Sequence, residues 1–380
     1  MPPPPSIVLP NAPRRILVRG VNWLGDAVMT TPALLRLRER FLGAHIALLT
    51  PAKLAELWPQ HPALDEVISF VPGEGSWRIG RRLQAARFEL GLVLPNSPRS
   101  ALQLWLAEIP QRVGYARPWR NWLLTHAVPP RPGEVRMRKR SVAEVRGLAG
   151  GAPPARHGAA PNPVGHHLHQ YLHLTTALGA RAEPLAPQLK VTREEVAQAR
   201  AKFGIDDEIC WLGINAGAEY GPAKRWPSAR FAAVARTLAD KLHCGLAIFG
   251  GSGDAALAME LQSAIGDRAA PIRNLAGRTT LRELMAALNS CRVLLTNDTG
   301  PMHVAAALGT PVVAIFGSTS PALTGPGLPG DPRHRLLQAD VACAPCFLRE
   351  CPIDFRCMNG VAVAQVVETV RELMRDRSPA

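Results

Sequence analysis

A strand, a helix start and a second strand follow one another between Arg292 and Gly317, and this run constrains the fold more than any other segment. Its two apolar stretches, Arg292–Thr296 and Val312–Phe316, have the composition of buried parallel strands. Between them, Asp298-Thr-Gly stands where a helix would begin. A strand that turns directly into a helix and returns as a parallel strand predicts an α/β fold.

The start of that helix is a candidate anion site. Thr299 or Asp298 would cap the helix, and Gly300 lets the backbone approach a bound group closely. Exposed amides and the helix dipole suit a phosphate or pyrophosphate, and His303 follows about one turn later. An ordinary capped helix with a hydrogen-bonded histidine explains the same residues, so both interpretations stay open.

Composition bounds the class of protein. The chain has 380 residues, of which 47% are hydrophobic, enough for two domains with separate cores. No apolar run reaches the length of a membrane span, so a soluble protein is expected. The first residues lack the features of a secretory signal, and we predict a disordered lead-in over residues 1–12. Seven cysteines without such a signal indicate a cytoplasmic protein with reduced thiols.

The charge is concentrated in the first half. Residues 1–185 hold 23 Lys and Arg against 11 Asp and Glu, a net charge of +12, whereas residues 186–380 hold 21 against 19. A basic half favours an anionic partner, such as a nucleic acid, an acidic membrane or a phosphorylated substrate. A coding bias toward Arg, Ala and Pro would raise the charge more evenly.

Short apolar runs alternate with helical stretches in both halves. The runs predicted as strands are Arg15–Arg19, His45–Leu49, Val67–Val71, Leu90–Leu94, Arg112–Tyr115, Cys210–Ile214, Gly245–Phe249, Val293–Thr296 and Val312–Phe316. This alternation predicts two Rossmann-like, doubly wound domains that face one another across a cleft. We place them at residues 13–183 and 184–360, with a C-terminal helix in 361–380 that packs back on the first domain. The Gly-, Pro- and Arg-rich stretch 131–164 is predicted to be a mobile loop.

Asp26 lies in the loop between the first predicted strand and the first helix. Ligands of open α/β sheets bind outside the carboxyl ends of the strands, which is where this loop falls. A carboxylate there is suited to accept a proton from a substrate hydroxyl. Capping of the helix explains the same residue, at about 1 kcal/mol, and the local sequence does not separate the two roles.

Two further loops follow predicted strands of the second half. In the first, Gly217 would let backbone amides face a ligand, while Lys224 and Arg225 add the positive charge that a phosphate requires. It is not a Walker loop, because no Gly-Lys-Ser/Thr follows the glycines, and a solvated Lys-Arg pair is the alternative. In the second loop, Asp254 would bond a ribose hydroxyl or cap the next helix.

Four cysteines, Cys343, Cys346, Cys351 and Cys357, cluster near the C-terminus. Four thiolates can hold zinc or an iron–sulfur cluster. The spacing is tight, however, and lacks the two separated Cys-x-x-Cys pairs of a zinc ribbon. We therefore expect no metal here.

Together, these segments resemble the lipopolysaccharide heptosyltransferases of glycosyltransferase family nine, and most closely its heptosyltransferase II branch. The residues that carry the resemblance are Trp23–Val28, Ala216–Pro227, Asn297–Ala306, Cys343–Pro352 and Cys357–Met358. It extends from about Arg15 to about Leu373. The combination is specific, although each part is not.

The resemblance implies a glycosyltransferase B fold, with the acceptor bound by the first domain and the nucleotide sugar by the second. It implies an inverting transfer of L-glycero-D-manno-heptose from ADP-heptose to the heptosyl-Kdo2-lipid A inner core, at the inner face of the inner membrane, without a required cofactor or metal. Asp26 matches the general base. The matching donor-binding residues are Lys224, Asp298, Thr299, Gly300, His303, Gly217 and, loosely, Asp254; those on the acceptor side are Asn22, Trp23 and Gly25. The stretch 136–163 is longer and richer in Gly and Pro than the family's loop, which leaves the acceptor structure open.

Other functions remain as alternatives. Another nucleotide-sugar glycosyltransferase or an epimerase of the same fold would keep the pyrophosphate turn without a base at Asp26. A nucleic-acid-binding protein would explain the basic half, but the sequence shows no aromatic–basic stacking motif or recognition helix. A dehydrogenase is disfavoured because Gly20–Gly25 does not give the glycine fingerprint of a dinucleotide site.

Overall fold

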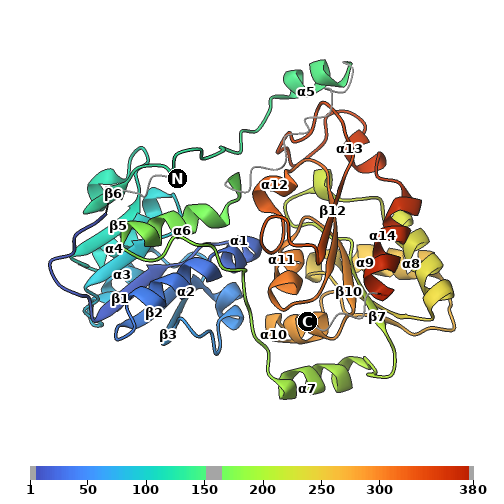
Figure 1. The fold of residues 1–380 in the computed structure, drawn as a ribbon, viewed down its shortest axis with the longest axis horizontal. Helices are drawn as coiled ribbons and strands as arrows, with labels where there is room; N and C mark the ends of the chain where they lie inside the picture. The colour runs from blue at the N-terminus through green and yellow to red at the C-terminus, as the bar shows by residue number, and fades with distance from the viewer. Residues whose placement is uncertain (1–5, 151–164, 376–380) are drawn as a thin grey trace. The chain divides into compact units, whose positions relative to one another are not determined.

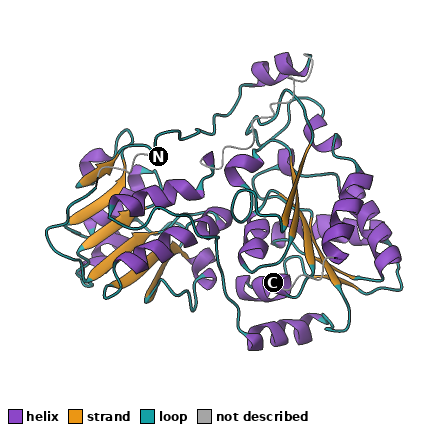
Figure 2. Cartoon of the chain, viewed as in Figure 1, coloured by secondary structure: helices purple, strands orange, loops and turns teal. Residues whose placement is uncertain are grey.

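The computed structural model describes residues 6–150 and 165–375, which form two compact units (Figure 1). Unit 1 comprises residues 1–134 and 164–190, and unit 2 comprises residues 135–163 and 191–380. Each unit has a parallel sheet of six strands with helices on both of its faces (Figure 2). The predicted α/β class with two doubly wound sheets is thereby confirmed.

The sheet of unit 1 has the strand order β3-β2-β1-β4-β5-β6. Its strands are β1 (Arg15–Arg19), β2 (His45–Pro51), β3 (Glu66–Phe70), β4 (Leu90–Val93), β5 (Gln111–Tyr115) and β6 (His126–Val128). The central strand β1 is buried over four of its five residues because both faces are covered by helices. The order reverses between β1 and β4, and such a switch point is where open α/β sheets bind ligands.

The helices of unit 1 pack in two groups, α2 with α6 and α3 with α4. The helices are α1 (Leu24–Met29), α2 (Thr31–Arg40), α3 (Ser76–Gln84), α4 (Pro98–Leu106) and α6 (Leu168–Ala177), with the 3₁₀ turns η1 (Ala52–Leu57) and η2 (Asn121–Leu123). Part of the predicted lead-in over residues 1–12 contacts this unit, since the Ile7 amide donates to the Ala177 carbonyl at 2.8 Å. Residues 1–5 lie outside the described part of the chain.

The sheet of unit 2 has the order β12-β11-β10-β7-β8-β9 and reverses between β10 and β7. Its strands are β7 (Trp211–Asn215), β8 (Gly245–Ile248), β9 (Ile272–Asn274), β10 (Val293–Asn297), β11 (Val312–Phe316) and β12 (His334–Gln338). All residues of β7, β10 and β11 are buried. The predicted donor-binding residues lie in the segments that follow β7, β8 and β10.

Helices cover the second sheet in two groups as well, with α10 against α7 and α11, and α8 against α9 and α14. The helices are α7 (Arg193–Phe203), α8 (Ser228–Leu242), α9 (Ala255–Ile265), α10 (Leu281–Asn289), α11 (Gly300–Ala307), α12 (Pro321–Thr324), α13 (Arg356–Asn359) and α14 (Val363–Arg375), with the 3₁₀ turns η4 (Pro222–Lys224) and η5 (Ser252–Asp254). The buried side of α14 belongs to the core of unit 2, through Val366, Val370 and Leu373. The predicted packing of this helix on the first domain stays a prediction.

The stretch that we predicted as a mobile loop, residues 131–164, contains a helix, α5 (Val142–Ala149). Ser141 and Glu144 close a capping box at its start, and Val145 packs against Cys343 and Cys346. Arg140 fixes the preceding turn, because its amide donates to the Cys346 carbonyl at 3.0 Å. The high Gly and Pro content hid this helix from the sequence analysis; residues 151–164 lie outside the described part.

Within the described residues, no helix is both long enough and apolar enough to span a bilayer.

Candidate functional site

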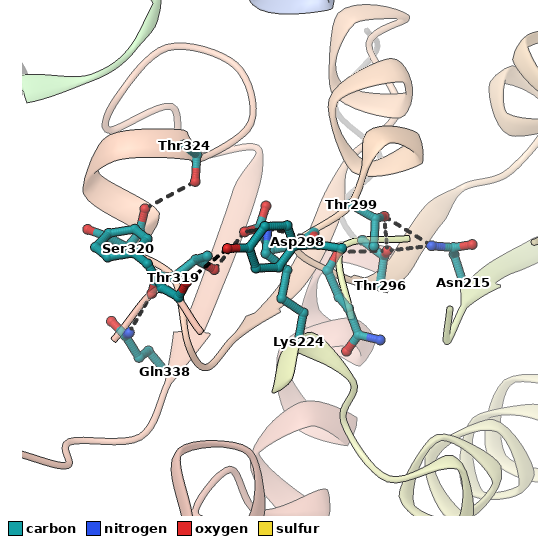
Figure 3. Close-up of polar contacts among 12 residues, drawn as sticks. Asn215, Lys224, Thr296, Asp298, Thr299, Thr319, Ser320, Thr324 and Gln338 are labelled. Carbon is teal, nitrogen blue, oxygen red and sulfur yellow. Dashed lines mark hydrogen bonds and ion pairs between the residues drawn. The ribbon is translucent and has the colours of Figure 1, made fainter. Parts of the chain in front are cut away.

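A buried ion pair joins two strand-end loops of unit 2. The Lys224 ammonium, in η4 after β7, lies 2.6 Å from Oδ2 of Asp298, which directly follows β10. The same oxygen accepts a 2.6 Å hydrogen bond from the Thr319 hydroxyl, in the loop after β11. Only 14% of the Lys224 side chain and 5% of the Asp298 side chain are exposed. Three loops from neighbouring strands therefore converge on one carboxylate (Figure 3).

A second set of hydrogen bonds fixes the start of α11. Thr299 is the last extended residue before this helix, and its hydroxyl accepts from the Asn215 amide at 3.0 Å. Asn215, at the end of β7, also donates to the Thr296 hydroxyl at 3.2 Å (Figure 3). Because its side chain is held, the backbone of Thr299 has a defined direction and the first amides of α11 remain at the strand ends.

The Asn297 side chain joins the same loops through hydrogen bonds. Its amide nitrogen donates to the Ala216 carbonyl at 2.7 Å, and its oxygen accepts from the Trp226 amide at 3.0 Å. Asn297 is fully buried, so both halves of its side chain are satisfied inside the protein. The loop that carries Lys224 is thus tied at both ends to the strand that carries Asp298.

Gly217 and Asp254 lie against one another, which joins the loops after β7 and β8. A Cβ atom at Gly217 would come within 2.5 Å of the Asp254 carboxylate, so only glycine fits there. The carboxylate also accepts from the Gly251 amide at 3.2 Å and lies 3.6 Å from the Arg225 guanidinium. The expected capping of α9 by Asp254 is not seen, because its side chain makes no capping hydrogen bond to that helix; its charge partner is Arg225 of the neighbouring loop.

The remaining predicted donor residues are on α11. Gly300 is its first residue. Pro301 follows it and, because proline has no backbone N–H, leaves no unpaired donor at the helix start. His303 is buried in the first turn of the helix. Its ring belongs to the interior of unit 2, which leaves the backbone amides as the groups of α11 best able to meet an anion.

In unit 1, Asp26 lies in the first turn of α1 and is half-buried. The N-cap residue of this helix is Trp23, whose side chain makes no capping hydrogen bond. The hydroxyl of Tyr171, on α6, donates to the Asp26 carboxylate. Burial raises the pKa of Tyr171 well above its ordinary value, and the nearby charge of Asp26 raises it further. Tyr171 is therefore a neutral donor at every physiological pH.

The three residues predicted on the acceptor side lie just before Asp26 in the same segment of the chain. Asn22 is exposed, and its oxygen accepts from the Arg19 guanidinium at 3.1 Å. Trp23 is exposed as well, with the Lys53 ammonium 5.4 Å from its ring, and Gly25 is half-buried in α1. Burial lowers the pKa of Arg19 to about 10, so it keeps its positive charge at neutral pH. The loop that carries Asp26 therefore has the positive charges of Arg19 and Lys53 and the aromatic ring of Trp23 beside it.

The four cysteines of the C-terminal segment gather in unit 2. Burial, together with smaller contributions from the nearby Cys343, Cys346 and Cys351, raises the pKa of Cys357 to about 12. Among the described residues, no group of three or more His, Cys, Asp or Glu side chains is arranged to hold a metal ion.

We expect the purified protein to contain far less than one zinc or iron per chain, because the cysteine cluster is held by packing of Val145 and its neighbours. Metal analysis after purification without chelator checks this. Near-stoichiometric metal, together with a lower melting temperature after chelation, would contradict the prediction.

The sequence analysis missed Thr319 and Tyr171. Thr319 follows a buried strand in the polar run Gly317-Ser-Thr-Ser, so the rule that found Asp298 would also have found it. Tyr171 reaches Asp26 from a helix distant in sequence, and no local pattern marks that contact.

Comparisons with known proteins give one family. A model of glycosyltransferase family 9 (heptosyltransferase) matches residues 76–355. Lipopolysaccharide heptosyltransferase 2 of Escherichia coli strain K12 is 33% identical over 326 residues, covering 82% of this chain and 85% of the relative. The solved structure of E. coli ADP-heptose lipopolysaccharide heptosyltransferase II covers 95% of this chain and 98% of its own, with a TM-score of 0.73 at 28% identity. A family 9 structure from Veillonella parvula shares the fold, with a TM-score of 0.77 at 23% identity over 97% of this chain and 99% of its own.

Proposed function

This chain belongs to glycosyltransferase family 9, the heptosyltransferases, and on that premise we propose that it is the second heptosyltransferase of lipopolysaccharide core synthesis. The proposed donor is ADP-heptose and the proposed acceptor is the heptosyl-Kdo2-lipid A inner core. The transfer inverts the anomeric carbon. The E. coli relatives, whose names give this activity and this donor, support the assignment.

The observation that carries the donor side is the Lys224–Asp298 pair beside the first amides of α11. A pyrophosphate needs positive charge and N–H donors that are fixed before it arrives, and Lys224 with these amides supplies both. Asp298 is itself an anion and would repel phosphate, so its role is to hold Lys224 and Thr319 in place. Gly217, which has no side chain, lets the loop after β7 lie against Asp254.

In the proposed reaction, Asp26 removes the proton of the acceptor hydroxyl as its oxygen attacks the anomeric carbon of the heptose. The bond from that carbon to the β-phosphate oxygen breaks, and ADP leaves with the electron pair. Lys224 and the amides at Thr299 and Gly300 stabilise the charge that develops on the leaving pyrophosphate. No residue of this step requires a metal, and we propose that none takes part.

The net charge of +12 in residues 1–185 fits a phosphorylated, anionic acceptor, and we propose that the protein acts in the cytoplasm, on the inner face of the inner membrane. The deciding experiment follows donor consumption. Purified protein is given ADP-heptose with Kdo2-lipid A that either carries or lacks its first heptose. Transfer only to the heptosylated acceptor supports the proposal; transfer to the bare acceptor, or none, contradicts it.

The second candidate is another nucleotide-sugar enzyme of the same fold, because the Lys224 and α11 arrangement would serve any nucleoside diphosphate sugar. A panel of donors distinguishes the two. A higher specificity constant with a UDP- or GDP-sugar than with ADP-heptose would favour this candidate.

The contact from Tyr171 to Asp26 predicts a shift in pH dependence. A hydrogen bond donated to a carboxylate stabilises its charged form, so its loss raises the pKa of the base. In Tyr171→Phe, we expect the acid limb of the rate profile to move to higher pH, with activity lost first below neutrality. Turnover on the plateau above this limb should change far less, because the hydrogen bond stabilises the carboxylate before it takes the proton. Measuring kcat and kcat/KM against pH checks this.

Tyr115→Phe is the matched control. Tyr115 is also buried, but its hydroxyl donates to the Gln170 carbonyl at 2.7 Å, so the same deletion leaves the donor to Asp26 intact. Equal melting temperatures for the two variants, with an unmoved acid limb in Tyr171→Phe, would show that Tyr171 serves only the packing of α6.

A further inference from the structure

Unit 1 displays tryptophan and arginine together on the side of its sheet formed by α3, α4 and η2. We call this surface the Trp–Arg face and define it by Trp77, Arg78, Arg81, Trp105, Trp119 and Trp122. Its tryptophans are 63%, 43%, 87% and 69% exposed in that order, although indole rings of this size are usually mostly buried. Such a group of exposed rings marks an interaction surface.

The face is continuous because its elements are in contact. Helix α3 packs closely on α4: a Cβ atom at Gly80 would lie 2.5 Å from that of Leu106. Trp105 on α4 and Trp122 in η2 meet edge to face, with ring centroids 6.2 Å apart. The Arg81 guanidinium lies 5.2 Å from the Trp77 ring. Figure 1 shows α3 and α4 on the same side of the first sheet.

The inner sides of these helices explain why the face points outward. Ile79 and Leu83 of α3 and Leu104 of α4 lie in the core of unit 1. Helical periodicity then turns Trp77 and Arg81 to the solvent. Turning α3 so that Trp77 is buried would bring Ile79 and Leu83 out of the core, so the exposure of Trp77 follows from the spacing of these residues.

The charge of the face has one sign. Between Ser76 and Trp122 there are eight arginines and two acids, Glu89 and Glu108. The Glu89 carboxylate is already engaged by the Arg14 amide, at 2.6 Å. Neighbouring Glu74 is nearly buried, beside Arg82. No acid on α3 or α4 offsets the exposed arginines.

We propose that the Trp–Arg face docks unit 1 on the surface of an anionic phospholipid bilayer. Tryptophan favours the boundary between headgroups and acyl chains, where its ring is in an apolar layer and its N–H in water. Arginine beside it pairs with lipid phosphates and lowers the cost of approach. A nucleic acid would explain the arginines, but four exposed tryptophans beside them suit the headgroup boundary of a bilayer.

This inference extends the proposed function, because an enzyme with a lipid acceptor must reach that acceptor at a membrane. Binding to the membrane can nevertheless be tested without heptose transfer. Trp77 lies at the start of α3, the helix that follows β3, and Asp26 lies in the first turn of α1, the helix that follows β1. Both are at the carboxyl edge of the first sheet, so docking through α3 would bring the Asp26 edge toward the bilayer.

The experiment is vesicle co-sedimentation of the full chain. Vesicles of phosphatidylglycerol with phosphatidylethanolamine are compared with vesicles of phosphatidylcholine alone. We expect binding to the anionic vesicles that falls as salt is raised. Arg78→Glu with Arg81→Glu should lower the partition about 25-fold or more, since each basic residue near the surface contributes about fivefold. Trp105→Ala with Trp122→Ala should lower it about tenfold, even at low salt.

The matched control for charge is Arg193→Glu with Lys241→Glu, which makes the same change in net charge at two exposed positions of unit 2. Leu42→Ala, an exposed apolar residue outside the face, is the control for the tryptophans. Both controls should bind like the unaltered protein, and the melting temperature of every variant is measured to exclude unfolding.

Two results would overturn the proposal: no sedimentation of the unaltered protein with anionic vesicles at low salt, or binding of the Arg78/Arg81 variant equal to that of its control. Binding to an oligonucleotide in place of the vesicles would assign the face to nucleic acid and also reject it. Heptose transfer to a detergent-dispersed acceptor is measured in parallel. Its failure would reject the proposed function while leaving the vesicle result intact.

Discussion

Asp26→Asn is expected to lower the turnover number by about a hundredfold or more, the usual effect of removing a general base. The substitution keeps the size of the side chain and one oxygen that can accept the Tyr171 hydrogen bond, so the geometry around α1 is preserved. Only the ability to take a proton is lost. Turnover with saturating donor and acceptor measures the effect.

The same variant separates catalysis from helix capping. Asp26 lies in the first turn of α1 and not at its N-cap, so if it only stabilised the helix dipole, Asn would replace it at a cost of about 0.3–1 kcal/mol. The melting temperature and ADP binding of Asp26→Asn are therefore expected to stay near those of the unaltered protein. Turnover that also stays near normal would eliminate Asp26 as the base.

Eight of the nine strands that the sequence predicted lie inside the two sheets, and the ninth, β3, lies at an edge. β1, β4, β7, β10 and β11 are continuous apolar runs because helices cover both of their faces. The three strands that it missed, β6, β9 and β12, lie at sheet edges. His126–Val128 and Ile272–Asn274 have only three residues, and His334–Gln338 alternates in burial, so no long apolar run marks them.

The sequence predicted those residues of the candidate site that are marked by their position after a strand. Asp26, Lys224 and Asp298 each come shortly after a buried strand, and a parallel sheet places all such loops of a unit at one edge. The partners of these residues depend on tertiary packing. The Lys224–Asp298 pair and the Tyr171–Asp26 contact join segments far apart in sequence, so their existence required the fold.

Lys224→Ala is expected to lower the specificity constant for the donor about 10- to 100-fold, the effect of losing one charged hydrogen bond in the transition state. The structure adds a second consequence. Asp298 is 5% exposed, and without Lys224 its Oδ2 would lose the ammonium and keep the hydrogen bond from the Thr319 hydroxyl. A buried carboxylate that loses its cation destabilises the fold, here by about 3 kcal/mol. Thermal unfolding and donor kinetics are therefore measured together.

The double variant Lys224→Ala with Asp298→Asn decides between the two consequences. The neutral amide at position 298 removes the stranded charge and still accepts from Thr319, so the melting temperature should recover much of what Lys224→Ala loses. Donor use should not recover, because the positive charge for the pyrophosphate is still missing. Asp298→Asn alone keeps that charge and should retain far more activity than either variant without Lys224. If donor kinetics return together with stability in the double variant, Lys224 acts only by holding Asp298 and the pyrophosphate has another cation.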